Sequence, residues 1–396
     1  MRKTPDKPRV KRDRPCGAQT AERMRIVRLM ITGGGTSGHI NPALAIAGAV
    51  RERLPDAEIL FVGTRRGLES ALVPGAGYPI EYIDVTGFER SLSPKNIVTA
   101  FKAAGSVLKA RGIIKRFSPD VVVGTGGYVS GPVLYAAASL GVPTAIHEQN
   151  AYPGVTTRIL SRFVDRVMCS MPPARPLKRQ DNVVMTGNPV RRELLAADRL
   201  AARARYSPAG KPMVLSYGGS GGALTINKAV ADMLALSVRE GRLAHLHGAG
   251  KRDYPDLRRT LLERGVPTDG TAGITVTEYI YDMAGAYAAA DLVVCRAGAV
   301  TLAELALLGK PAILVPSPNV TENHQYHNAM AFAKGGAAVV IEDDKLTGAL
   351  LYRRIKELID SPQTLASMSR KAREKAFPRA LDDIADIVVG LSEGRA

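Results

Sequence analysis

Short apolar runs alternate with amphipathic segments along most of the chain. The first such unit has an apolar run at 26–32, a glycine-rich turn at 33–39 and a segment at 40–54 whose apolar residues recur at helical spacing. Asn41 and Pro42 have the residue types of an N-cap and a first helical position. Further strand candidates lie at 58–64, 121–124 and 143–148. Because strands and helices alternate, the pattern predicts a parallel, doubly wound sheet.

The same unit returns in the second half of the chain. It has an apolar run at 213–217, a glycine-rich turn at 218–222 and a helical segment at 223–234. Further strand candidates lie at 244–250, 274–280, 291–298 and 311–316. A chain of 396 residues also exceeds what one hydrophobic core usually covers. We therefore predict an α/β protein with two Rossmann-like, doubly wound parallel-sheet domains that face a cleft.

The joint between the two domains is expected near residues 186–194, between the last strand of the first half and an Ala/Arg-rich stretch. The segment from about residue 360 has a helical composition and is expected to cross back to the first half. The resulting division is a disordered basic tail at 1–23, an N-terminal domain at 24–190, a C-terminal domain at 191–365 and a C-terminal helix at 366–396.

The charge and the cysteine content indicate the type of partner and the cellular compartment. The formal charge is +17, and residues 1–28 alone hold ten Lys or Arg against three acids. Such a charge fits an anionic partner. Cys16, Cys169 and Cys295 are far apart and lack metal-ligand spacing, which favours a reducing compartment. No run approaches the ~20 apolar residues of a membrane-spanning helix, so we expect a protein that can lie on a membrane but does not cross it.

The first glycine-rich turn has a known chemistry. Gly33, Gly35 and Gly38 match G-x-G-x-x-G between a predicted strand and a predicted helix, as in a dinucleotide-binding turn. A nicotinamide site also has an acidic residue at the end of the second strand, which holds the ribose. Here that strand ends in Gly63 and Thr64. The sequence therefore argues against a hydride-transferring dehydrogenase.

Three glycine-rich loops follow predicted strands, at 33–39, 125–132 and 218–223. Parallel strands place such turns along one edge of a sheet, so two facing sheets would line a cleft with N–H groups suited to diphosphates. The alternative is that the glycines only permit tight packing of strand against helix. Two diphosphates, one on a donor and one on an acceptor, would account for three loops. The residues expected at the acceptor diphosphate are Gly35, Gly126, Gly127 and Ser130.

Several segments carry a resemblance to a known family. They include GGGTSGHINPALAIA (33–47), HEQN (147–150), TGNPVRREL (186–194), YGGSGGALTIN (217–227), RAGAVTLAE (296–304) and ENHQYHNA (322–329). In order and content they resemble the MurG family, the UDP-N-acetylglucosamine:lipid I transferases of bacterial peptidoglycan synthesis. The chain departs from the family pattern at Ser37 and Gly221, where members often have Gly and Gln, and at His324, where some members have a second Gln.

The resemblance implies a GT-B fold and inversion at the anomeric carbon. It implies transfer of N-acetylglucosamine (GlcNAc) from UDP-GlcNAc to the 4-hydroxyl of N-acetylmuramic acid (MurNAc) in undecaprenyl-pyrophosphoryl-MurNAc-pentapeptide, or lipid I, which forms lipid II. UDP-GlcNAc and lipid I are then the substrates, with no cofactor and no bound metal. The expected location is peripheral, on the anionic cytoplasmic face of the bacterial cell membrane, with other cell-wall synthesis proteins as further partners.

Two other classes of protein remain as alternatives. A nucleic-acid binder would explain the charge, but only 5% of residues are aromatic and no recognition motif is present, so we expect no nucleic-acid partner. A UDP-GlcNAc epimerase, or another UDP-sugar-dependent enzyme of the same fold, would share the donor site. Conversion of free UDP-GlcNAc without a lipid acceptor would favour the epimerase.

The resemblance also implies a donor site, which lies mainly in the second half of the chain. Glu304 is expected to accept hydrogen bonds from the ribose hydroxyls, while the helix start near residue 299 faces the diphosphate. The alternative for Glu304 is a first-turn acid that only favours the helix dipole. Ile280 would bind uracil through its main chain while its side chain packs in the core, and Gln325 would bind sugar hydroxyls. The full set is Thr36, Ser37, Gly38, Asn150, Arg191, Ser220, Ile280, Ala299, Val300, Thr301, Leu302, Ala303, Glu304 and Gln325.

Inverting transfer needs a base near the acceptor hydroxyl. His39 closes the first glycine-rich loop, and an imidazole with an ordinary pKa near 6.5 accepts a proton at cellular pH, so His39 is the candidate base. The alternative is that His39 only binds the acceptor phosphate. Glu148 and Tyr128 are rival or assisting catalytic groups.

The segment 93–117 is expected to hold the protein on the membrane. It has one apolar stripe for the core and a second one flanked by cations, as in a helix that lies in a membrane interface. The alternative is a helix buried on two sides, or one broken at Gly105 or Gly112. The expected membrane patch consists of Ile97, Phe101, Leu108, Lys102 and Lys109.

Overall fold

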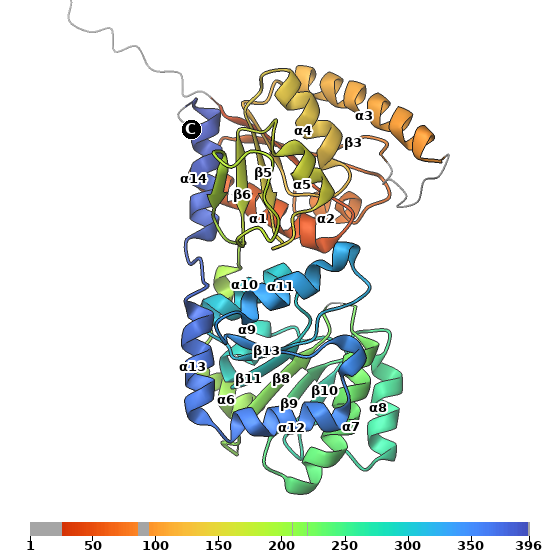
Figure 1. Ribbon diagram of the computed structural model, residues 1–396, viewed down its shortest axis with the longest axis vertical. Helices are drawn as coiled ribbons and strands as arrows, with labels where there is room; N and C mark the ends of the chain where they lie inside the picture. Colours follow the sequence, from red (N-terminus) through yellow and green to blue (C-terminus); the bar gives the residue numbers. More distant parts are fainter. Residues whose placement is uncertain (1–25, 86–94, 208, 220, 395–396) are drawn as a thin grey trace, which may run out of the picture.

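The computed structural model describes residues 26–85, 95–207, 209–219 and 221–394, without the side chains of residues 95–104 and 192. The expected basic tail at 1–23 and Cys16 lie outside the described residues. Two α/β domains, each built on a parallel sheet, lie one above the other along the long axis in Figure 1. The predicted fold class is confirmed.

The N-terminal sheet has seven parallel strands in the order β3-β2-β1-β4-β5-β6-β7. They are β1 (Arg28–Thr32), β2 (Glu58–Gly63), β3 (Ile80–Tyr82), β4 (Val121–Gly124), β5 (Thr144–Glu148), β6 (Arg166–Cys169) and β7 (Val183–Met185). In β1, Leu29 and Ile31 belong to one hydrophobic core and Met30 to the other, because both faces of the sheet are covered. The helices are α1 (Ser37–Arg53), α2 (Glu69–Gly75), α3 (Lys95–Phe117), α4 (Ser130–Ser139) and α5 (Val155–Leu160).

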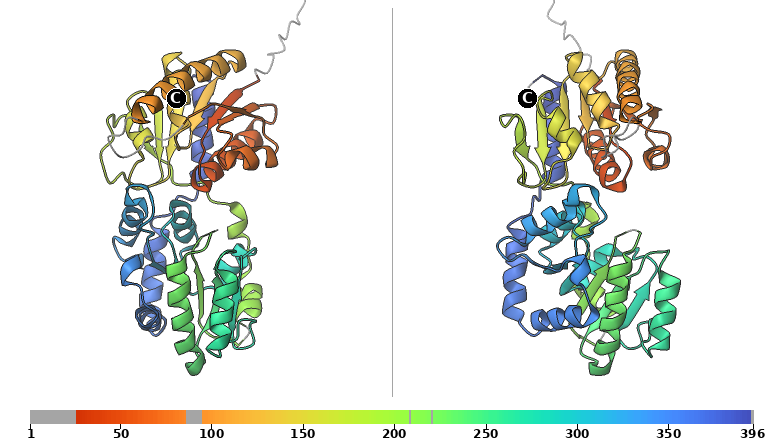
Figure 2. Two further views of the ribbon diagram at one scale, coloured as in Figure 1. Left: turned by 90° about the vertical axis from the view of Figure 1, so that its right-hand side faces the viewer. Right: turned by 45° about the vertical axis from the view of Figure 1, so that its right-hand side comes forward.

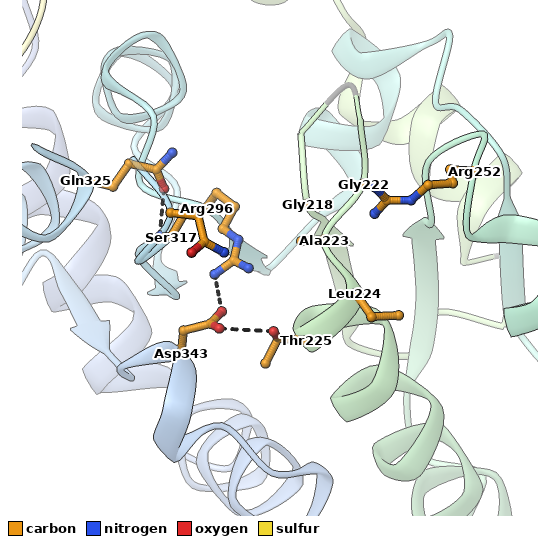
Figure 3. Close-up of a pocket in the computed structure, with 11 residues that line it drawn as sticks. Gly218, Gly222, Ala223, Leu224, Thr225, Arg252, Arg296, Ser317, Gln325 and Asp343 are labelled. Atoms are coloured by element: carbon orange, nitrogen blue, oxygen red, sulfur yellow. Dashed lines mark hydrogen bonds and ion pairs between the residues drawn. The ribbon is translucent and has the colours of Figure 1, made fainter. Parts of the chain in front are cut away.

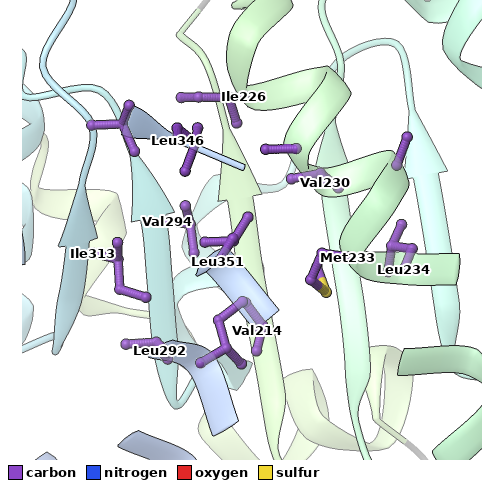
Figure 4. Packing of buried hydrophobic residues seen from close by; sticks show 14 of the residues in the cluster. Val214, Ile226, Val230, Met233, Leu234, Leu292, Val294, Ile313, Leu346 and Leu351 are labelled. Carbon is purple, nitrogen blue, oxygen red and sulfur yellow. The ribbon is translucent and has the colours of Figure 1, made fainter. Parts of the chain in front are cut away.

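The C-terminal sheet has six parallel strands in the order β10-β9-β8-β11-β12-β13. They are β8 (Met213–Tyr217), β9 (Ala244–Gly248), β10 (Ile274–Thr277), β11 (Leu292–Cys295), β12 (Ala312–Leu314) and β13 (Ala338–Val340). One face packs on α7 and α12, where Val214 and Val294 of the sheet belong to the same core as Val230 and Leu351 of the helices (Figure 4).

The helices of the C-terminal half complete this domain. They are α6 (Arg199–Tyr206), α7 (Leu224–Glu240), α8 (Tyr254–Glu263), α9 (Met283–Ala289), α10 (Ala299–Leu308), α11 (His324–Ala333), α12 (Gly348–Ile359) and α13 (Pro362–Arg373), with 3₁₀ turns η1 (Arg192–Leu195), η2 (Thr321–Asn323) and η3 (Asp343–Lys345). Asp198, Asp282 and Thr347 cap the starts of α6, α9 and α12 by accepting main-chain N–H bonds.

The last helix, α14 (Ala380–Ser392), returns to the N-terminal domain. Ile384, Ala385, Val388 and Leu391 are buried in the same core as the inner face of α1. Figures 1 and 2 show α13 along the C-terminal domain and α14 along the N-terminal one. The chain therefore crosses between the domains twice, after β7 and after α13.

One detail differs from the sequence expectations, and one alternative, a broken α3, is excluded. Helix α1 begins at Ser37, after an extended Thr36, so Asn41 and Pro42 lie inside it and not at its start. The burial of Ile40 and Ala43 stabilises this extra turn, and proline removes only one helical donor from it. Helix α3 runs through Gly105 and Gly112 without a break. Within the described parts of the chain, no helix is long and apolar enough to cross a membrane.

Candidate active site

The first two glycine-rich loops pack directly on each other at the carboxyl ends of β1 and β4. A Cβ atom at Gly127 would lie 2.4 Å from the carbonyl oxygen of Gly34, and Gly127 has a φ of 82°. A Cβ atom at Gly126 would lie 2.8 Å from the His39 ring. Only glycine fits this contact, so the two loops present the His39 imidazole at the edge of the sheet.

Among the described residues, His39 has a hydrogen-bond partner for one ring nitrogen and none for the other. Its Nδ1 lies 3.0 Å from the carbonyl oxygen of Gly34 and 3.3 Å from Oγ1 of Thr36. A carbonyl only accepts hydrogen bonds, so Nδ1 carries the proton and Nε2 keeps a lone pair. Burial lowers the pKa of His39, although the Gly34 carbonyl and the charge of Glu148 act in the opposite direction. The neutral form that can accept a proton is therefore favoured at cellular pH.

Glu148, at the end of β5, orders the loop that follows it. Its carboxylate accepts hydrogen bonds from the main chain of Asn150 at 3.1 Å and of Gly154 at 3.0 Å, and from the Thr157 hydroxyl at 2.6 Å. The side chain is almost fully buried. By contrast, Tyr128 on the second glycine-rich loop is 63% exposed. Glu148 thus fits an assisting role in this loop better than that of a free base.

Side chains of the same loop reach across to the C-terminal domain. The Oδ1 atom of Asn328 accepts the Ala151 N–H at 2.8 Å, and its Nδ2 donates to Oδ1 of Asn150 at 3.1 Å. Arg158 forms an ion pair with Glu322 at 2.6 Å. The ring of Tyr152 stacks on His327, with centroids 4.9 Å apart. The two domains therefore meet through contacts between the 148–158 segment and residues 322–328, which comprise the end of η2 and the first half of α11.

The C-terminal domain contains a cavity of about 400 Å³ beside the third glycine-rich loop. Gln325 and Ser317 line it on the side of α11, where the Ser317 N–H donates to Oε1 of Gln325 at 2.9 Å (Figure 3). No described residue accepts from the amide N–H groups of Gln325, so these donors face the cavity's ligand in our reading. Arg296 lines it too and pairs with Asp343, which also accepts from the Thr225 hydroxyl at 3.0 Å. The lining therefore offers several hydrogen-bond donors.

A second polar feature of this domain is the start of α10. Its N-cap, Gly298, has no side-chain cap, so the first N–H groups of the helix remain unpaired by a cap. Glu304 follows one turn later and accepts a hydrogen bond from the Tyr287 hydroxyl at 2.9 Å. Burial raises the pKa of Glu304, while the Tyr287 hydrogen bond and the charge of Arg191 lower it. An anion-binding helix start and a carboxylate thus lie on one helix.

Comparison with known proteins identifies this arrangement. Residues 29–169 match the glycosyltransferase family 28 N-terminal domain, and residues 213–384 match its C-terminal domain. The UDP-N-acetylglucosamine--N-acetylmuramyl-(pentapeptide) pyrophosphoryl-undecaprenol N-acetylglucosamine transferase of Desulforamulus reducens is 46% identical over 90% of this chain and 97% of its own. The enzyme of the same name from Acetivibrio thermocellus is 44% identical over 93% of this chain and 100% of its own.

Solved structures agree with the sequence matches. The crystal structure of Acinetobacter baumannii MurG superposes with a TM-score of 0.74 at 30% identity, over 92% of this chain and 99% of that one. The chain belongs to the MurG family of glycosyltransferases. Its GT-B fold is thereby confirmed. A UDP-N-acetylglucosamine 2-epimerase superposes at 0.63 and 13% identity, over 94% of this chain and 97% of that one, which shows a shared fold alone.

The structure brings most of the residues expected from the MurG resemblance to the two domain edges. Thr36, Ser37 and Gly38 form the start of α1 beside His39, and Ala299, Val300 and Thr301 form the start of α10. Asn150 contacts Asn328, and exposed Arg191 acts on Glu304. Ser220, and the side chains of Ile97, Phe101 and Lys102, lie outside the described residues.

Some expected roles have to change. The Ser130 side chain is fully buried, and its hydroxyl donates to the Gly126 carbonyl at 2.7 Å, so it shapes the second loop and does not face an acceptor diphosphate. The Gly35 N–H already donates to the Glu69 carboxylate. Glu304 lies beyond the first turn of α10, which removes the explanation that it only favours the helix dipole.

Three other expected donor residues, Ile280, Leu302 and Ala303, have apolar side chains, so their expected role in binding rests on the main chain. The Ile280 side chain packs in the core, as expected, and within the described chain neither its N–H nor its C=O forms a hydrogen bond with the protein. Leu302 is fully buried and Ala303 is partly buried on the same helix. Side-chain identity carries no information about such main-chain roles.

Sequence reasoning missed several residues that build the site. Glu69, Asn328, Arg296 and Asp343 have no functional role in the sequence analysis, yet each holds a loop or a wall of the two domain edges. A signal for Asn328 was present in the ENHQYHNA segment, but nothing in a single sequence shows which residue it faces across the cleft.

We predict that Asn328→Leu weakens the coupling between the domains. The substitution leaves the buried Ala151 N–H without its acceptor, which costs about 1–3 kcal/mol. Differential scanning calorimetry should show a lower melting temperature and partial separation of the two domain transitions. Asn182→Leu is the matched control, because Asn182 is equally buried and its side-chain hydrogen bonds in the described chain stay within the N-terminal domain. A single unshifted transition for Asn328→Leu would contradict the assignment.

Proposed function

We propose that the chain is an inverting N-acetylglucosaminyltransferase that moves GlcNAc from UDP-GlcNAc to the 4-hydroxyl of MurNAc in lipid I, forming lipid II. One observation carries the proposal. A free imidazole nitrogen, Nε2 of His39, stands at the edge of one domain, and the other domain offers a polar cavity and an uncapped helix start. The relatives that match nearly the whole chain are named for this transfer.

The donor is proposed to bind on the C-terminal domain. The diphosphate lies at the start of α10, where unpaired N–H groups and the helix dipole favour negative charge. Glu304 accepts hydrogen bonds from the ribose hydroxyls, and the free main-chain groups of Ile280 pair with uracil. Gln325 donates from its amide nitrogen to the sugar.

The acceptor is proposed to bind on the N-terminal domain. Among the described residues, no protein group accepts from the N–H groups of Gly126 and Gly127, which leaves both for the acceptor diphosphate. This position places the MurNAc hydroxyl near His39, because the ring lies directly against Gly126. Tyr128, exposed on the same loop, is available to the acceptor sugar.

The chemistry follows from these placements. Nε2 of His39 takes the proton from the MurNAc 4-hydroxyl as its oxygen attacks the anomeric carbon, and the bond from that carbon to the UDP oxygen breaks. The negative charge that develops on UDP is stabilised by the start of α10 and by the third glycine-rich loop. The lowered pKa of His39 then favours release of the proton to solvent before the next turnover. In this proposal no metal or cofactor takes part.

The membrane attachment is a separate part of the proposal. Leu108 on α3 is 71% exposed, and Lys109 lies beside it, paired with Asp84 at 3.5 Å. On the neighbouring α4 and α5 region, exposed Tyr135 and Phe163 pack edge to face. Apolar and aromatic side chains next to cations suit an anionic bilayer surface, and each cation near it adds ~1 kcal/mol. We propose the cytoplasmic membrane face as the location, with other cell-wall synthesis proteins nearby.

An assay with radiolabelled UDP-GlcNAc, with and without a lipid I analogue, tests the reaction. The proposal expects label in the lipid product only when the acceptor is present. The second candidate is a UDP-GlcNAc epimerase, favoured only by the shared fold. It predicts a change in free UDP-GlcNAc without any acceptor, and that outcome would overturn the transferase assignment.

Glu304→Ala should weaken UDP-GlcNAc binding about ten- to hundred-fold, because hydrogen bonds to a charged group contribute about 1.5–3 kcal/mol. Isothermal titration calorimetry measures the donor affinity, and circular dichroism checks the fold. Glu357→Ala, which removes an exposed carboxylate of the same domain, is the control. Unchanged donor affinity in Glu304→Ala would remove Glu304 from the ribose.

His39→Ala should lower kcat by about 10²–10⁴-fold, the usual contribution of a general base. Donor affinity should stay within about two-fold, since His39 belongs to the other domain. Steady-state kinetics at saturating donor separates the two effects. If only the acceptor KM rises, His39 binds the phosphate and is not the base.

Leu108→Asp should reduce flotation with anionic liposomes while turnover of a short-chain soluble acceptor is preserved, because a charge replaces an apolar group at the proposed bilayer contact. Leu200→Asp is the matched control, since Leu200 is 83% exposed on the C-terminal domain. Equal flotation of the two variants would argue against a contact through α3.

A further inference from the structure

A buried carboxylate that the mechanism above does not use, Glu69, lies beneath the first glycine-rich loop. Glu69 is the first residue of α2 and is fully buried. Its Oε2 accepts the Gly35 N–H at 2.9 Å, and its Oε1 accepts from the main chain of Thr64 at 2.9 Å and from the Thr64 hydroxyl at 2.7 Å. Cβ atoms at Gly34 and Gly67 would lie 2.5 Å and 2.0 Å from this carboxylate. Two loops are thus folded closely around one acidic group.

This contact changes what the first loop can do. In a dinucleotide-binding turn, the N–H groups of the loop would face a phosphate. Here the Gly35 N–H is already taken by a carboxylate, whose charge also repels a phosphate at that position. A different main-chain group of the same loop contacts the proposed catalytic base. The carbonyl of Gly34, one residue before Gly35, binds Nδ1 of His39.

The charge on Glu69 persists inside the fold. Burial opposes ionisation, but the hydrogen bonds from Gly35 and Thr64 outweigh it and hold the pKa of Glu69 below its ordinary value. A buried anion is therefore fixed behind the loop that carries the base. Three ionisable groups act on the His39 ring from the surrounding elements: Glu148 at the end of β5, His324 at the start of α11, and Glu69.

We propose that Glu69 is a positioning residue for the catalytic base, acting through the first glycine-rich loop. Its carboxylate holds the Gly34–Gly35 peptide in the orientation that aims the Gly34 carbonyl at Nδ1 of His39. This carbonyl selects the ring tautomer with a free Nε2, and the buried negative charge maintains the basicity of that nitrogen. The proposal rests on the proposed role of His39 in the transfer, and it assigns the first loop to the base and not to a phosphate at Gly35.

The effect on pH dependence has a definite sign. His39 acts only when neutral, so kcat/KM rises with pH through the pKa of His39. Burial and His324 lower this pKa, while Glu148 and Glu69 raise it. Removing the charge of Glu69 therefore moves the rising limb of the profile to lower pH. The weaker, less well-fixed base also lowers the plateau of kcat.

Two substitutions at Glu69 separate charge from shape. Glu69→Gln keeps the size but removes the charge, and Glu69→Asp keeps the charge but shortens the reach. For Glu69→Gln we expect kcat to fall about ten- to hundred-fold, as for a misplaced catalytic group, with donor KM unchanged and the rising limb at lower pH. For Glu69→Asp we expect a lower kcat with the limb in its original place. The control, Glu81→Gln, removes a carboxylate from β3 that pairs with Arg116, and it should change neither quantity.

A second measurement does not depend on turnover. In protein labelled with ¹⁵N at histidine, the ring nitrogens of His39 should report a proton on Nδ1 in the wild type and a mixture of tautomers in Glu69→Gln. A purely structural role would lower the melting temperature of both variants and reduce their activity with an unmoved limb and an unchanged tautomer, which would overturn the proposal. If wild-type protein transfers no GlcNAc to a lipid I analogue, the proposed function fails instead, whatever the His39 spectrum shows.

Discussion

The site depends on the close contact of two backbones, where Gly127 meets the carbonyl of Gly34 at the carboxyl edge of the N-terminal sheet. Parallel pairing of β1 with β4 brings the two loops together, and a side chain at Gly127 would separate them. The same Gly34 carbonyl then fixes the His39 ring. Strand pairing, loop packing and the protonation state of the base are thus linked through one peptide group.

The HEQN segment shows how four consecutive residues connect this edge to the rest of the molecule. His147 is fully buried, its pKa lowered by burial to about 4, and its Nε2 binds the Gly187 carbonyl at the crossing between domains. Glu148 orders the following loop, and Gln149 donates to the carbonyl of Thr125 at 2.9 Å, at the base of the second glycine-rich loop. Asn150 contacts the C-terminal domain. The four residues at the end of β5 thus contact the domain crossing, the following loop, the second glycine-rich loop and the C-terminal domain.

The sequence predicted the long apolar strands and the order of loops and helices, because buried parallel strands read as continuous apolar runs. It missed β6, β3, β7 and β13. The last three have only three residues each and are partly exposed, so they carry little periodicity. The start of α1 was wrong because Asn-Pro is a strong local signal, whereas burial of Ile40 is a tertiary effect.

The candidate site residues also fall into two groups: those with a local sequence signal and those that only tertiary contacts reveal. Residues such as His39 and Glu304 stand inside distinctive segments, and the structure places both at domain edges. Glu69 lies in an ordinary amphipathic segment, and its partners Gly35 and Thr64 become neighbours only when β1 pairs with β2. A nicotinamide site would have its acidic residue at the end of the predicted second strand, which ends at Thr64. Glu69 lies five residues further along the chain. Long-range pairing of this kind is not visible in one sequence.

The glycine-rich sequence pattern is associated with two properties, tight packing of the backbone and anion binding by N–H groups. In this structure different parts of the chain provide them. In the third loop, Cβ atoms at Gly218 and Gly222 would each lie 2.3 Å from main-chain atoms, so these glycines serve packing, as the alternative in the sequence analysis held. N–H groups open to an anion also lie at the helix starts beside the loops, because α1, α4, α7 and α10 all begin without a side-chain cap. Tight turns bring the helix starts to the carboxyl edge of each sheet. Because no side chain caps these starts, the partial positive charge of each helix dipole is not neutralised there. The G-x-G-x-x-G spacing therefore reports the approach of a helix to a strand, and the chemistry of the site depends on what the chain leaves unpaired there.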